Sequence, residues 1–244
     1  MIAIDGLQKR FGDVLAVRGV CLQAADGTVT GLLGPNGAGK TTTLRLLSGL
    51  MRPDAGTIQV DDVDVVADPV GAQRVMGQLP DSRGLYPRLT AREHIDYFAR
   101  LHGLSTEVTR ERTARLLSRL GLQAIADRRV AGFSQGERTK VALARALVHQ
   151  PRNVILDEPT NGLDVMSTRA VREVIRGLRS DGCCVVFSSH IMQEVSALCD
   201  RIVVIADGRV VADGTADDLR ALTGRDNLED AFVALAGLDH GALP

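Results

Sequence analysis

The chain has 244 residues, a formal net charge of −1 at pH 7 and 24% charged residues, which is typical of one large or two small globular domains. This near-neutral balance excludes a protein that binds nucleic acid or anionic lipid through a strong overall positive field. No apolar run approaches the roughly 20 residues that cross a bilayer. Without Trp and with 3% aromatic residues, the chain offers no evident stacking platform for single-stranded nucleic acid.

The first third of the chain has the pattern of β-strands around one helix. The predicted elements are, in chain order, an edge strand at 2–10, strands at 14–23 and 29–33, a helix at 40–50, and short strands at 57–60 and 75–80. The helix is expected to carry Leu44, Leu47 and Leu50 on one side, facing the core.

A glycine-rich loop joins the buried strand at 29–33 to the helix at 40–50. It fits the phosphate-binding pattern G-x-x-x-x-G-K-[ST] and consists of Gly34, Pro35, Asn36, Gly37, Ala38, Gly39, Lys40, Thr41 and Thr42. Backbone N–H groups at a helix N-terminus are unpaired and attract anions, and glycines let the backbone curl closely around phosphates. We therefore expect Lys40 to reach the β- and γ-phosphates of a nucleotide and the Thr41 hydroxyl to bind Mg²⁺. An ordinary glycine-rich turn is the alternative.

From about residue 90 to residue 149 the pattern changes to that of helices. Thr90 with Glu93, and Ser134 with Glu137, have the spacing of capping boxes, which predict helix starts. A third helix is expected to begin at residue 106 and to end at Gly121. Its arginines are interpreted as a solvated face, with a basic binding patch as the alternative. They are Arg110, Arg112, Arg115 and Arg119.

Beyond residue 150 strands and helices alternate. The predicted elements are strands at 154–156, 184–188, 202–206 and 210–212 and helices at 165–178 and 191–198. This alternation favours an α/β fold with a mostly parallel sheet, into which the helical segment from about 90 to 149 is inserted. The tail at 216–244 is expected to form two short helices.

Two acidic residues and one histidine follow predicted strands. Asp157 ends the strand at 154–156, where a carboxylate can hold the water shell of a metal ion. Glu158 comes next and is well placed to orient or deprotonate an attacking water, although two acids starting a loop are the alternative. His190 follows the strand at 184–188, where it could donate to a γ-phosphate, but a structural histidine is the more common case.

In this order and spacing, the motifs from about residue 2 to residue 215 resemble those of the ATP-binding subunits of ATP-binding cassette (ABC) transporters. The stretch most specific to that family is Phe133-Ser134-Gln135-Gly136-Glu137-Arg138 with the helix after it, which is similar to the signature loop LSGGQ. The resemblance implies an α/β fold: a P-loop NTPase core with a mostly parallel sheet, an N-terminal antiparallel β portion and a helical subdomain at about 88–150. It also implies an ATPase domain at 1–220 and a helical tail at 221–244.

The resemblance assigns the residues of hydrolysis. Asp157 would close the Walker B strand and bind Mg²⁺ with Thr41, Glu158 would be the catalytic glutamate, and His190 would be the switch histidine. The signature loop would contact ATP held by a partner subunit through Ser134, Gln135, Gly136 and Glu137. The D-loop would touch the same partner and consists of Asn161, Gly162, Leu163 and Asp164.

Other positions match the family less closely. Phe11 would stack on adenine, with Val17 beneath the ribose or the ring. Asp81, rather than Gln78, falls where the family usually has the Q-loop glutamine, and a carboxylate there can still bind Mg²⁺. In the signature loop, Gln135 and Glu137 replace the usual Gly and Gln.

The resulting hypothesis is an ATPase that uses ATP and Mg²⁺ and drives transport, with export as the expected direction, through a separate multi-spanning permease. It would pair head to tail with a second cassette subunit, expected to be an identical copy, with a different cassette as the alternative. Residues 80–86 and 227–232 are similar to the exporter branch that includes sodium-extrusion ATPases. The rivals are a soluble ABC ATPase acting on ribosomes or DNA and a module that binds nucleotide without hydrolysis. No nucleic-acid partner is expected.

The expected location is the cytoplasm, on the inner face of the cell membrane. Residues 1–10 lack the apolar core of a signal peptide. The cysteines show no C-x-x-C spacing, so we expect no zinc site and reduced, mostly buried thiols. They are Cys21, Cys183, Cys184 and Cys199.

Overall fold

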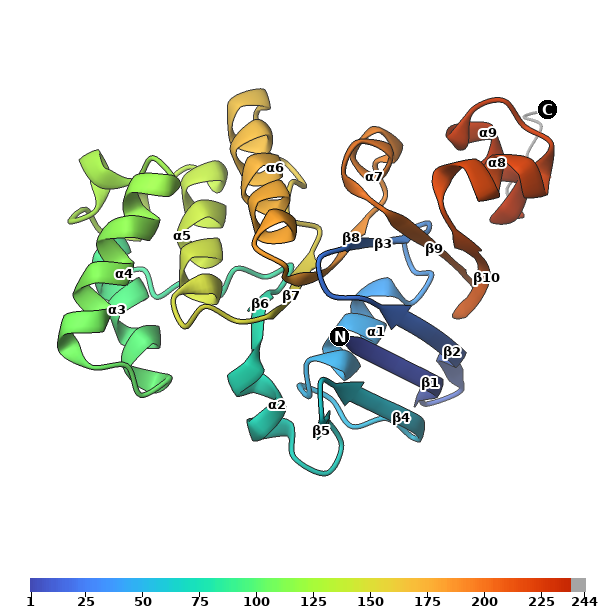
Figure 1. Ribbon diagram of the computed structural model, residues 1–244, viewed down its shortest axis with the longest axis horizontal. Coiled ribbons are helices and arrows are strands. Elements are labelled where there is room, and N and C mark those ends of the chain that lie inside the picture. Colours follow the sequence, from blue (N-terminus) through green and yellow to red (C-terminus); the bar gives the residue numbers. More distant parts are fainter. Residues whose placement is uncertain (238–244) are drawn as a thin grey trace.

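The computed structural model describes residues 1–237 and contains two sheets with helices around them (Figure 1). The N-terminal sheet is antiparallel, with the strand order β2-β1-β4-β5. Its strands are β1 (Ile2–Phe11), β2 (Val14–Ala24), β4 (Ala55–Val60) and β5 (Val63–Asp64). Because β1 pairs with both β2 and β4, the prediction of an edge strand was wrong. Its polar positions line the solvent-facing side of the sheet, which in sequence looks like a free edge.

The second sheet has the strand order β10-β9-β3-β8-β7-β6, and only the β9–β10 pair is antiparallel. Its strands are β3 (Val29–Leu33), β6 (Met76–Leu79), β7 (Asn153–Asp157), β8 (Cys184–Ser189), β9 (Arg201–Ala206) and β10 (Arg209–Gly214). Every residue of β3, β7 and β8 is buried, as expected for parallel strands covered on both faces. The predicted α/β fold with a mostly parallel sheet is confirmed.

The two faces of this central sheet belong to two hydrophobic clusters. One cluster joins Val154 and Phe187 of the sheet to helices α5, α6 and α7. These helices are α5 (Gln135–Leu147), α6 (Val165–Ser180) and α7 (Met192–Leu198). The other cluster joins Ile155 and Val186 to the N-terminal sheet and to α1 (Lys40–Leu47). Helix α1 ends earlier than predicted, and Leu50, expected on its apolar side, is exposed.

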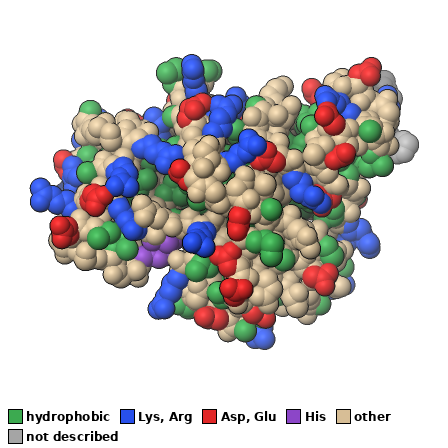
Figure 2. Space-filling view, in the orientation of Figure 1, with side chains coloured by type: hydrophobic (Ala, Val, Ile, Leu, Met, Phe, Trp, Pro, Cys, Tyr) green, Lys and Arg blue, Asp and Glu red, His purple; other side chains and the backbone are tan. Residues whose placement is uncertain are grey.

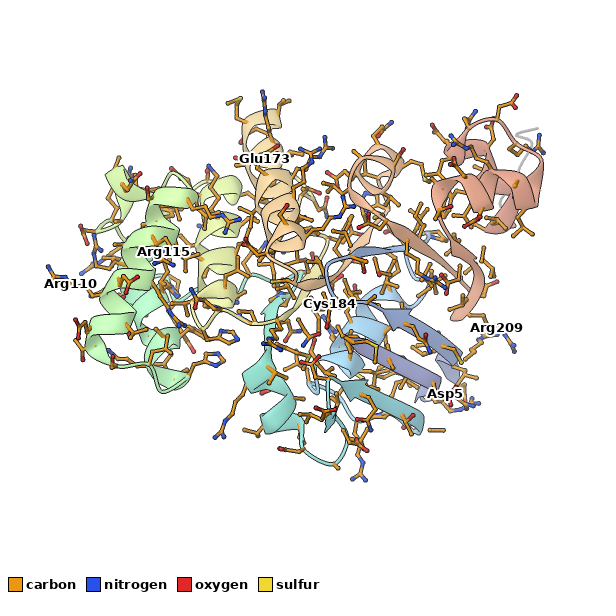
Figure 3. The ribbon with its side chains drawn as sticks, viewed as in Figure 1. Asp5, Arg110, Arg115, Glu173, Cys184 and Arg209 are labelled. Carbon is orange, nitrogen blue, oxygen red and sulfur yellow. The ribbon has the colours of Figure 1, made fainter. Side chains whose placement is uncertain are left out.

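The helical part lies beside the sheets and consists of α3 (Ala91–Leu101), α4 (Thr106–Arg119), α5 and the short 3₁₀ turns η1 (Gln123–Ile125) and η2 (Val130–Gly132) (Figure 1). Both predicted capping boxes are present, at Thr90 with Glu93 and at Ser134 with Glu137. Arg110 and Arg115 of α4 are exposed (Figure 3). Basic and acidic side chains are interspersed over the face seen in Figure 2, in agreement with a solvated helix face.

Three shorter helices complete the described chain. Helix α2 (Pro69–Val75) was not predicted, although Asp68 caps it by accepting from the Gly71 N–H. The two predicted tail helices are α8 (Ala216–Thr223) and α9 (Leu228–Leu235), and Leu219 and Leu228 bury them against the α5–α7 cluster. The last residues of the predicted tail, 238–244, lie outside the described residues. No helix in residues 1–237 is long and apolar enough to cross a membrane.

The four cysteines are free thiols. Cys184 is buried in β8 near the centre of the molecule (Figure 3), Cys183 and Cys199 are half-buried, and Cys21 is exposed. Burial raises the pKa of the Cys184 thiol to about 12, so this group stays protonated near neutral pH. The thiols were predicted to be mostly buried, and this prediction is wrong for Cys21, which is exposed.

Candidate functional site

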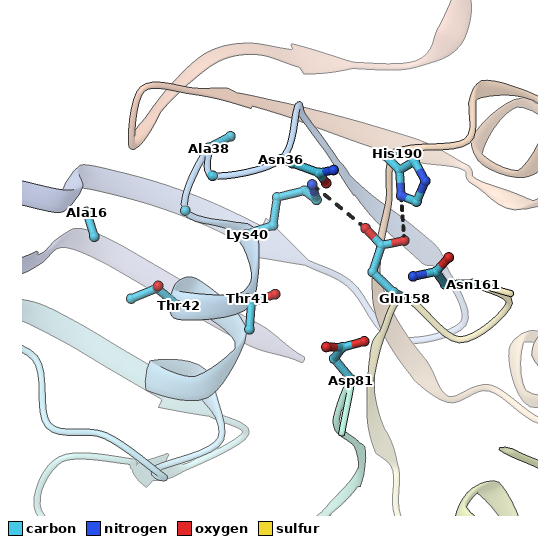
Figure 4. Close-up of a pocket in the computed structure, with 12 residues that line it drawn as sticks. Ala16, Asn36, Ala38, Lys40, Thr41, Thr42, Asp81, Glu158, Asn161 and His190 are labelled. Atoms are coloured by element: carbon cyan, nitrogen blue, oxygen red, sulfur yellow. Dashed lines mark hydrogen bonds and ion pairs between the residues drawn. The ribbon is translucent and has the colours of Figure 1, made fainter. Parts of the chain in front are cut away.

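The carboxyl ends of β3, β7 and β8 meet at one edge of the parallel sheet, where open α/β sheets bind ligands. A cavity of about 430 Å³ lies there (Figure 4). Its lining residues are Ala16, Asn36, Gly37, Ala38, Gly39, Lys40, Thr41, Thr42, Asp81, Glu158, Asn161 and His190. The structure thus brings most of the glycine-rich loop together with both predicted catalytic residues and Asp81.

The start of α1 is open to an anion. Its N-cap is Gly39, which has no side chain to pair the first N–H groups, and no acidic residue lies in the first turn. Gly39 has φ 103°, and a Cβ there would lie 2.5 Å from the carbonyl oxygen of Ala16. Only glycine fits this position, and it lets the loop turn closely into the N-terminus of α1, where a phosphate can bind.

Lys40 extends along this loop with 6% of its side chain exposed. Its Nζ donates to the carbonyl oxygens of Gly34 at 2.7 Å and Pro35 at 3.2 Å and lies 3.8 Å from Oε1 of Glu158. Burial lowers the pKa of Lys40, while the carboxylates of Glu158 and Asp157 oppose that shift. A cation held among neutral carbonyls is well suited to pair with a phosphate.

Thr41 and Asp157, predicted to bind Mg²⁺, lie in contact. The Thr41 hydroxyl donates to Oδ1 of Asp157 at 3.2 Å, and Ser188 at the end of β8 donates to the same oxygen at 2.6 Å. Hydroxyl and carboxylate oxygens are the ligands that Mg²⁺ prefers. The donor set therefore fits this ion, and Asp81 faces the same cavity with an exposed carboxylate.

Glu158 lies between Lys40 and His190. Its Oε2 is 2.9 Å from Nδ1 of His190, and 12% of its side chain is exposed (Figure 4). Its backbone has φ 47°, the left-handed region that residues with a Cβ rarely adopt. The Glu158 N–H donates to the Ser188 hydroxyl at 2.9 Å, which helps to hold that conformation. A carboxylate fixed by a cation and a histidine at the cavity wall can orient a water toward a phosphate.

The signature residues do not line this cavity. Gln135 donates to the carbonyl oxygen of Asn161 at 3.1 Å, and Gly136 packs against α6, where a Cβ would lie 2.3 Å from Oγ of Ser167. The D-loop residue Asp164 caps α6 by accepting from the N–H and hydroxyl of Ser167, which lowers the pKa of Asp164. The signature loop and the D-loop therefore lie against each other, and of these two loops only Asn161 lines the cavity that contains the phosphate loop of the same chain.

The two residues predicted to contact the adenosine part of ATP, Phe11 and Val17, do not line this cavity, and their roles stay predictions. Val17 has no exposed surface and packs in the core, while its neighbour Ala16 lines the cavity. Alternation along β2 turns successive side chains to opposite faces, which is why these two neighbours differ. Phe11 is 46% exposed at the end of β1 and is not among the lining residues; Lys9 lies over its ring at 5.9 Å.

Sequence reasoning missed two residues that contact the site. Ser188 bonds both Asp157 and Glu158, and Arg83 donates to the carbonyl oxygen of Glu158. Ser188 could have been predicted, because it is a hydroxyl residue near the carboxyl end of a predicted strand. No local pattern marked Arg83.

A phosphate loop, two carboxylates at a strand end and a neighbouring histidine define a nucleotide-hydrolysing α/β protein. Residues 17–161 match the family described as ABC transporter. The chain is 42% identical to the ABC transporter ATP-binding protein NatA of Bacillus subtilis (strain 168) over 96% of this chain and 97% of that protein. The chain therefore belongs to the ABC transporter family, as an ATP-binding subunit that hydrolyses ATP.

Other similar proteins agree with this assignment. The daunorubicin resistance ATP-binding protein DrrA3 of Streptomyces coeruleorubidus is 42% identical over 93% of this chain and 72% of its own length. A solved ATP-binding subunit of an ABC transporter superposes with a TM-score of 0.89 at 31% identity, covering 96% of this chain and 99% of that one. A dimeric post-hydrolysis structure of the cassette MJ0796 bound to ADP and Pi has a TM-score of 0.81 at 25% identity, over 88% and 98% of the two chains.

Proposed function

We propose that this chain binds ATP with Mg²⁺ and hydrolyses it as one half of a head-to-tail pair of identical chains, with Glu158 and His190 as the catalytic residues. The phosphate loop would hold the phosphates, and Thr41, Asp157 and Asp81 would hold the metal ion. Mg²⁺ would neutralise phosphate charge when bound, while Glu158 orients the attacking water and His190 orients Glu158. The ATPase domain would span 1–220, followed by the tail at 221–244.

One observation carries the pairing. The cavity contains the phosphate loop and Glu158 of this chain, whereas no signature residue lines it, and Gln135 donates to Asn161 of the D-loop instead. Because the start of α5 does not line the cavity of its own chain, it would contact an ATP bound by another chain. A second copy placed head to tail would bring its signature loop onto the open side. The dimeric MJ0796 cassettes among the similar structures support this arrangement.

A membrane partner is the second part of the proposal. The chain would act on the cytoplasmic face of a membrane, docked to a multi-spanning permease through the helical part and the loop at 81–88. Relatives named as an ABC transporter ATP-binding protein, a daunorubicin resistance protein and a Nod factor export protein support export as the direction. The transported compound would be selected by the permease.

The catalytic assignment can be tested with Glu158→Gln, which keeps the size of the side chain but removes the carboxylate. We expect the variant to bind ATP, to dimerise in the presence of ATP and Mg²⁺, and to release phosphate at least about a hundredfold more slowly than wild type. Light scattering measures the dimer and a phosphate-release assay the rate. Wild-type turnover by Glu158→Gln would contradict the assignment, and an ATP-loaded variant that stays monomeric would contradict the pairing.

The partner can be tested by co-purification from the native cell. Glu158→Gln is tagged and loaded with ATP, the membranes are gently solubilised, and the proteins that elute with it are identified. A multi-spanning partner absent from a Lys40→Ala preparation would support the permease. Recovery in the soluble fraction with ribosomal or DNA-repair proteins would favour the soluble ABC ATPase instead.

A further inference from the structure

Arg83 contacts three parts of the catalytic machinery from the loop between β6 and α3. Its Nη1 donates to the carbonyl oxygens of Pro80 at 2.8 Å and Asp81 at 2.9 Å, both on its own loop. Its Nη2 donates to the carbonyl oxygen of Glu158 at 3.1 Å, and its Nε donates to the hydroxyl of Thr139 on α5 at 3.1 Å. Four of the five N–H groups of a guanidinium are thus used, by acceptors on three different segments.

The hydrogen bond from Arg83 to Glu158 is made to a residue with an unfavourable backbone conformation. With φ 47°, Glu158 holds a left-handed conformation that persists only where the surrounding structure imposes it. Its N–H is fixed by the Ser188 hydroxyl at 2.9 Å. Its carbonyl oxygen accepts from Arg83 at 3.1 Å and from the N–H of Asn161 at 3.3 Å. Both backbone polar groups of Glu158 are therefore hydrogen-bonded, and in this conformation its carboxylate lies next to Lys40 and His190.

The acceptors around Arg83 suit a bridging role better than a simple ion pair. All four hydrogen bonds of its side chain go to neutral carbonyl or hydroxyl oxygens, while Asp81, Asp157 and Glu158 act on the guanidinium through space. Burial lowers the pKa of Arg83, but arginine stays charged far above neutral pH. Lysine could carry the charge, but its single nitrogen could not span the same set of acceptors.

We propose that Arg83 is a positioning residue for hydrolysis: it holds the Glu158 backbone in its left-handed turn and links it rigidly to the Asp81 loop and to the signature helix α5. The proposal rests on the proposed catalytic role of Glu158. It adds that a shift of the 80–88 loop changes the aim of the Glu158 carboxylate through Arg83. If the permease docks on that loop, Arg83 is the contact through which docking alters turnover.

The chain offers a matched control in Arg145. This arginine of α5 is 8% exposed, donates to the carbonyl oxygen of Gly84 on the same loop at 3.2 Å, and lies 4.8 Å from the centre of the Phe98 ring. Like Arg83, it holds the loop through a hydrogen bond to a backbone carbonyl, but its hydrogen bond goes to Gly84 and not to Glu158. A merely structural role of the loop arginines predicts similar defects in both variants.

The experiment compares Arg83→Lys with Arg145→Lys. Steady-state phosphate release gives kcat and KM, fluorescent-nucleotide titration gives the Kd for ATP, and thermal unfolding confirms the fold. We expect Arg83→Lys to lower kcat about tenfold to a hundredfold with ATP Kd within about threefold of wild type. Arg145→Lys should keep kcat within about twofold. Wild-type kcat in Arg83→Lys, or equal losses in the two variants, would overturn the proposal.

Chemical rescue supplies an independent readout. Arg83→Ala should lose at least as much kcat as Arg83→Lys, and added guanidinium, at concentrations that leave wild type unaffected, should restore several-fold activity. Sodium chloride at equal ionic strength should restore none. If Arg83→Ala does not fold, Arg83→Lys and Arg83→Gln test the proposal: both should lower kcat and leave the Kd for ATP nearly unchanged.

Glu158→Gln measured in parallel separates the two hypotheses. If Glu158→Gln turns over at the wild-type rate, the catalytic assignment fails whatever Arg83→Lys does. If Glu158→Gln is inactive while Arg83→Lys is fully active, only the role of Arg83 fails.

Discussion

Oε2 of Glu158 lies 2.9 Å from Nδ1 of His190, and these residues follow two neighbouring parallel strands, β7 and β8. The distance from the Glu158 carboxylate to Lys40 is longer, at 3.8 Å. The histidine is therefore the group that fixes the orientation of the carboxylate, while the lysine supplies the opposite charge. A water bound to this carboxylate would face the cavity in which the phosphates are expected.

Removing the imidazole should impair hydrolysis more than binding. His190→Ala deletes the hydrogen bond that orients Glu158, so we expect kcat to fall about a hundredfold while the Kd for ATP changes less than about threefold. His190→Gln keeps a hydrogen-bonding group and should retain more activity than His190→Ala. Phosphate release and fluorescent-nucleotide titration measure the two effects. A large loss of ATP affinity with unchanged kcat would show that His190 serves binding instead.

The Thr41 hydroxyl should control the dependence on Mg²⁺. Thr41→Val preserves the shape of the side chain but removes an oxygen that lies 3.2 Å from Asp157. We expect the Mg²⁺ concentration for half-maximal phosphate release to rise about tenfold or more. Thr41→Ser, which keeps the hydroxyl, should behave like wild type. Equal Mg²⁺ dependence in Thr41→Val and Thr41→Ser would remove Thr41 from the metal site.

Gly39 combines a positive φ with a close backbone neighbour, so its replacement should be costly. Gly39→Ala places a Cβ 2.5 Å from the carbonyl oxygen of Ala16, and the loop must distort to accept it. We expect the free energy of unfolding to fall by about 2 kcal/mol and the ATP affinity to fall at least tenfold. Gly121→Ala is the control, because Gly121 has φ 64° with nothing within 4 Å of the added Cβ. Its unfolding free energy should fall by about 1 kcal/mol with unchanged ATP affinity.

Features that depend on local sequence patterns and on the order of the motifs could be predicted from the sequence. The phosphate loop, the strand-end position of Asp157 and Glu158, and the capping boxes at Thr90 and Ser134 all depend on residues close together in the chain. The alternation of strands and helices also sufficed for the α/β fold. The edge assignment of β1 failed because strand order depends on contacts with β4, about 50 residues away in the sequence.

Contacts at the site that depend on strand register and on distant residues could not be predicted for the same reason. Val17 is buried while its neighbour Ala16 lines the cavity, and a motif match without strand register does not say which of the two faces the site. Arg83 bonds Glu158, 75 residues later, so no window of sequence contains both partners. The bonds from Arg83 and to Ser188 that hold the turn at Glu158 join residues far apart in the sequence, so local patterns could not predict them.

A stacked histidine pair outside the nucleotide site makes stability depend on pH. The rings of His102 and His149 lie parallel with their centres 3.6 Å apart, where the ends of α3 and α5 meet. Nε2 of His149 lies 3.0 Å from the carbonyl oxygen of Met76, the first residue of β6. Burial, and then the neighbouring His102, lower the pKa of His149 from 6.5 to about 4. The neutral ring is therefore the form that fits the folded protein.

The direction of the pH effect follows from this lowered pKa. The unfolded chain takes up a proton on His149 below pH 6.5, whereas the folded protein does so only near pH 4, so stability is lost as the pH falls through this window. We expect His149 to account for as much as about 3 kcal/mol of that loss. His149→Gln keeps a donor for the Met76 carbonyl but does not titrate, so its unfolding free energy should vary less between pH 7 and pH 4. His102→Gln removes the neighbouring ring that helps to lower the pKa of His149. The pH range over which stability is lost should therefore become narrower without disappearing. Denaturant unfolding at several pH values measures the three proteins, and parallel pH profiles for wild type and His149→Gln would contradict the role of His149.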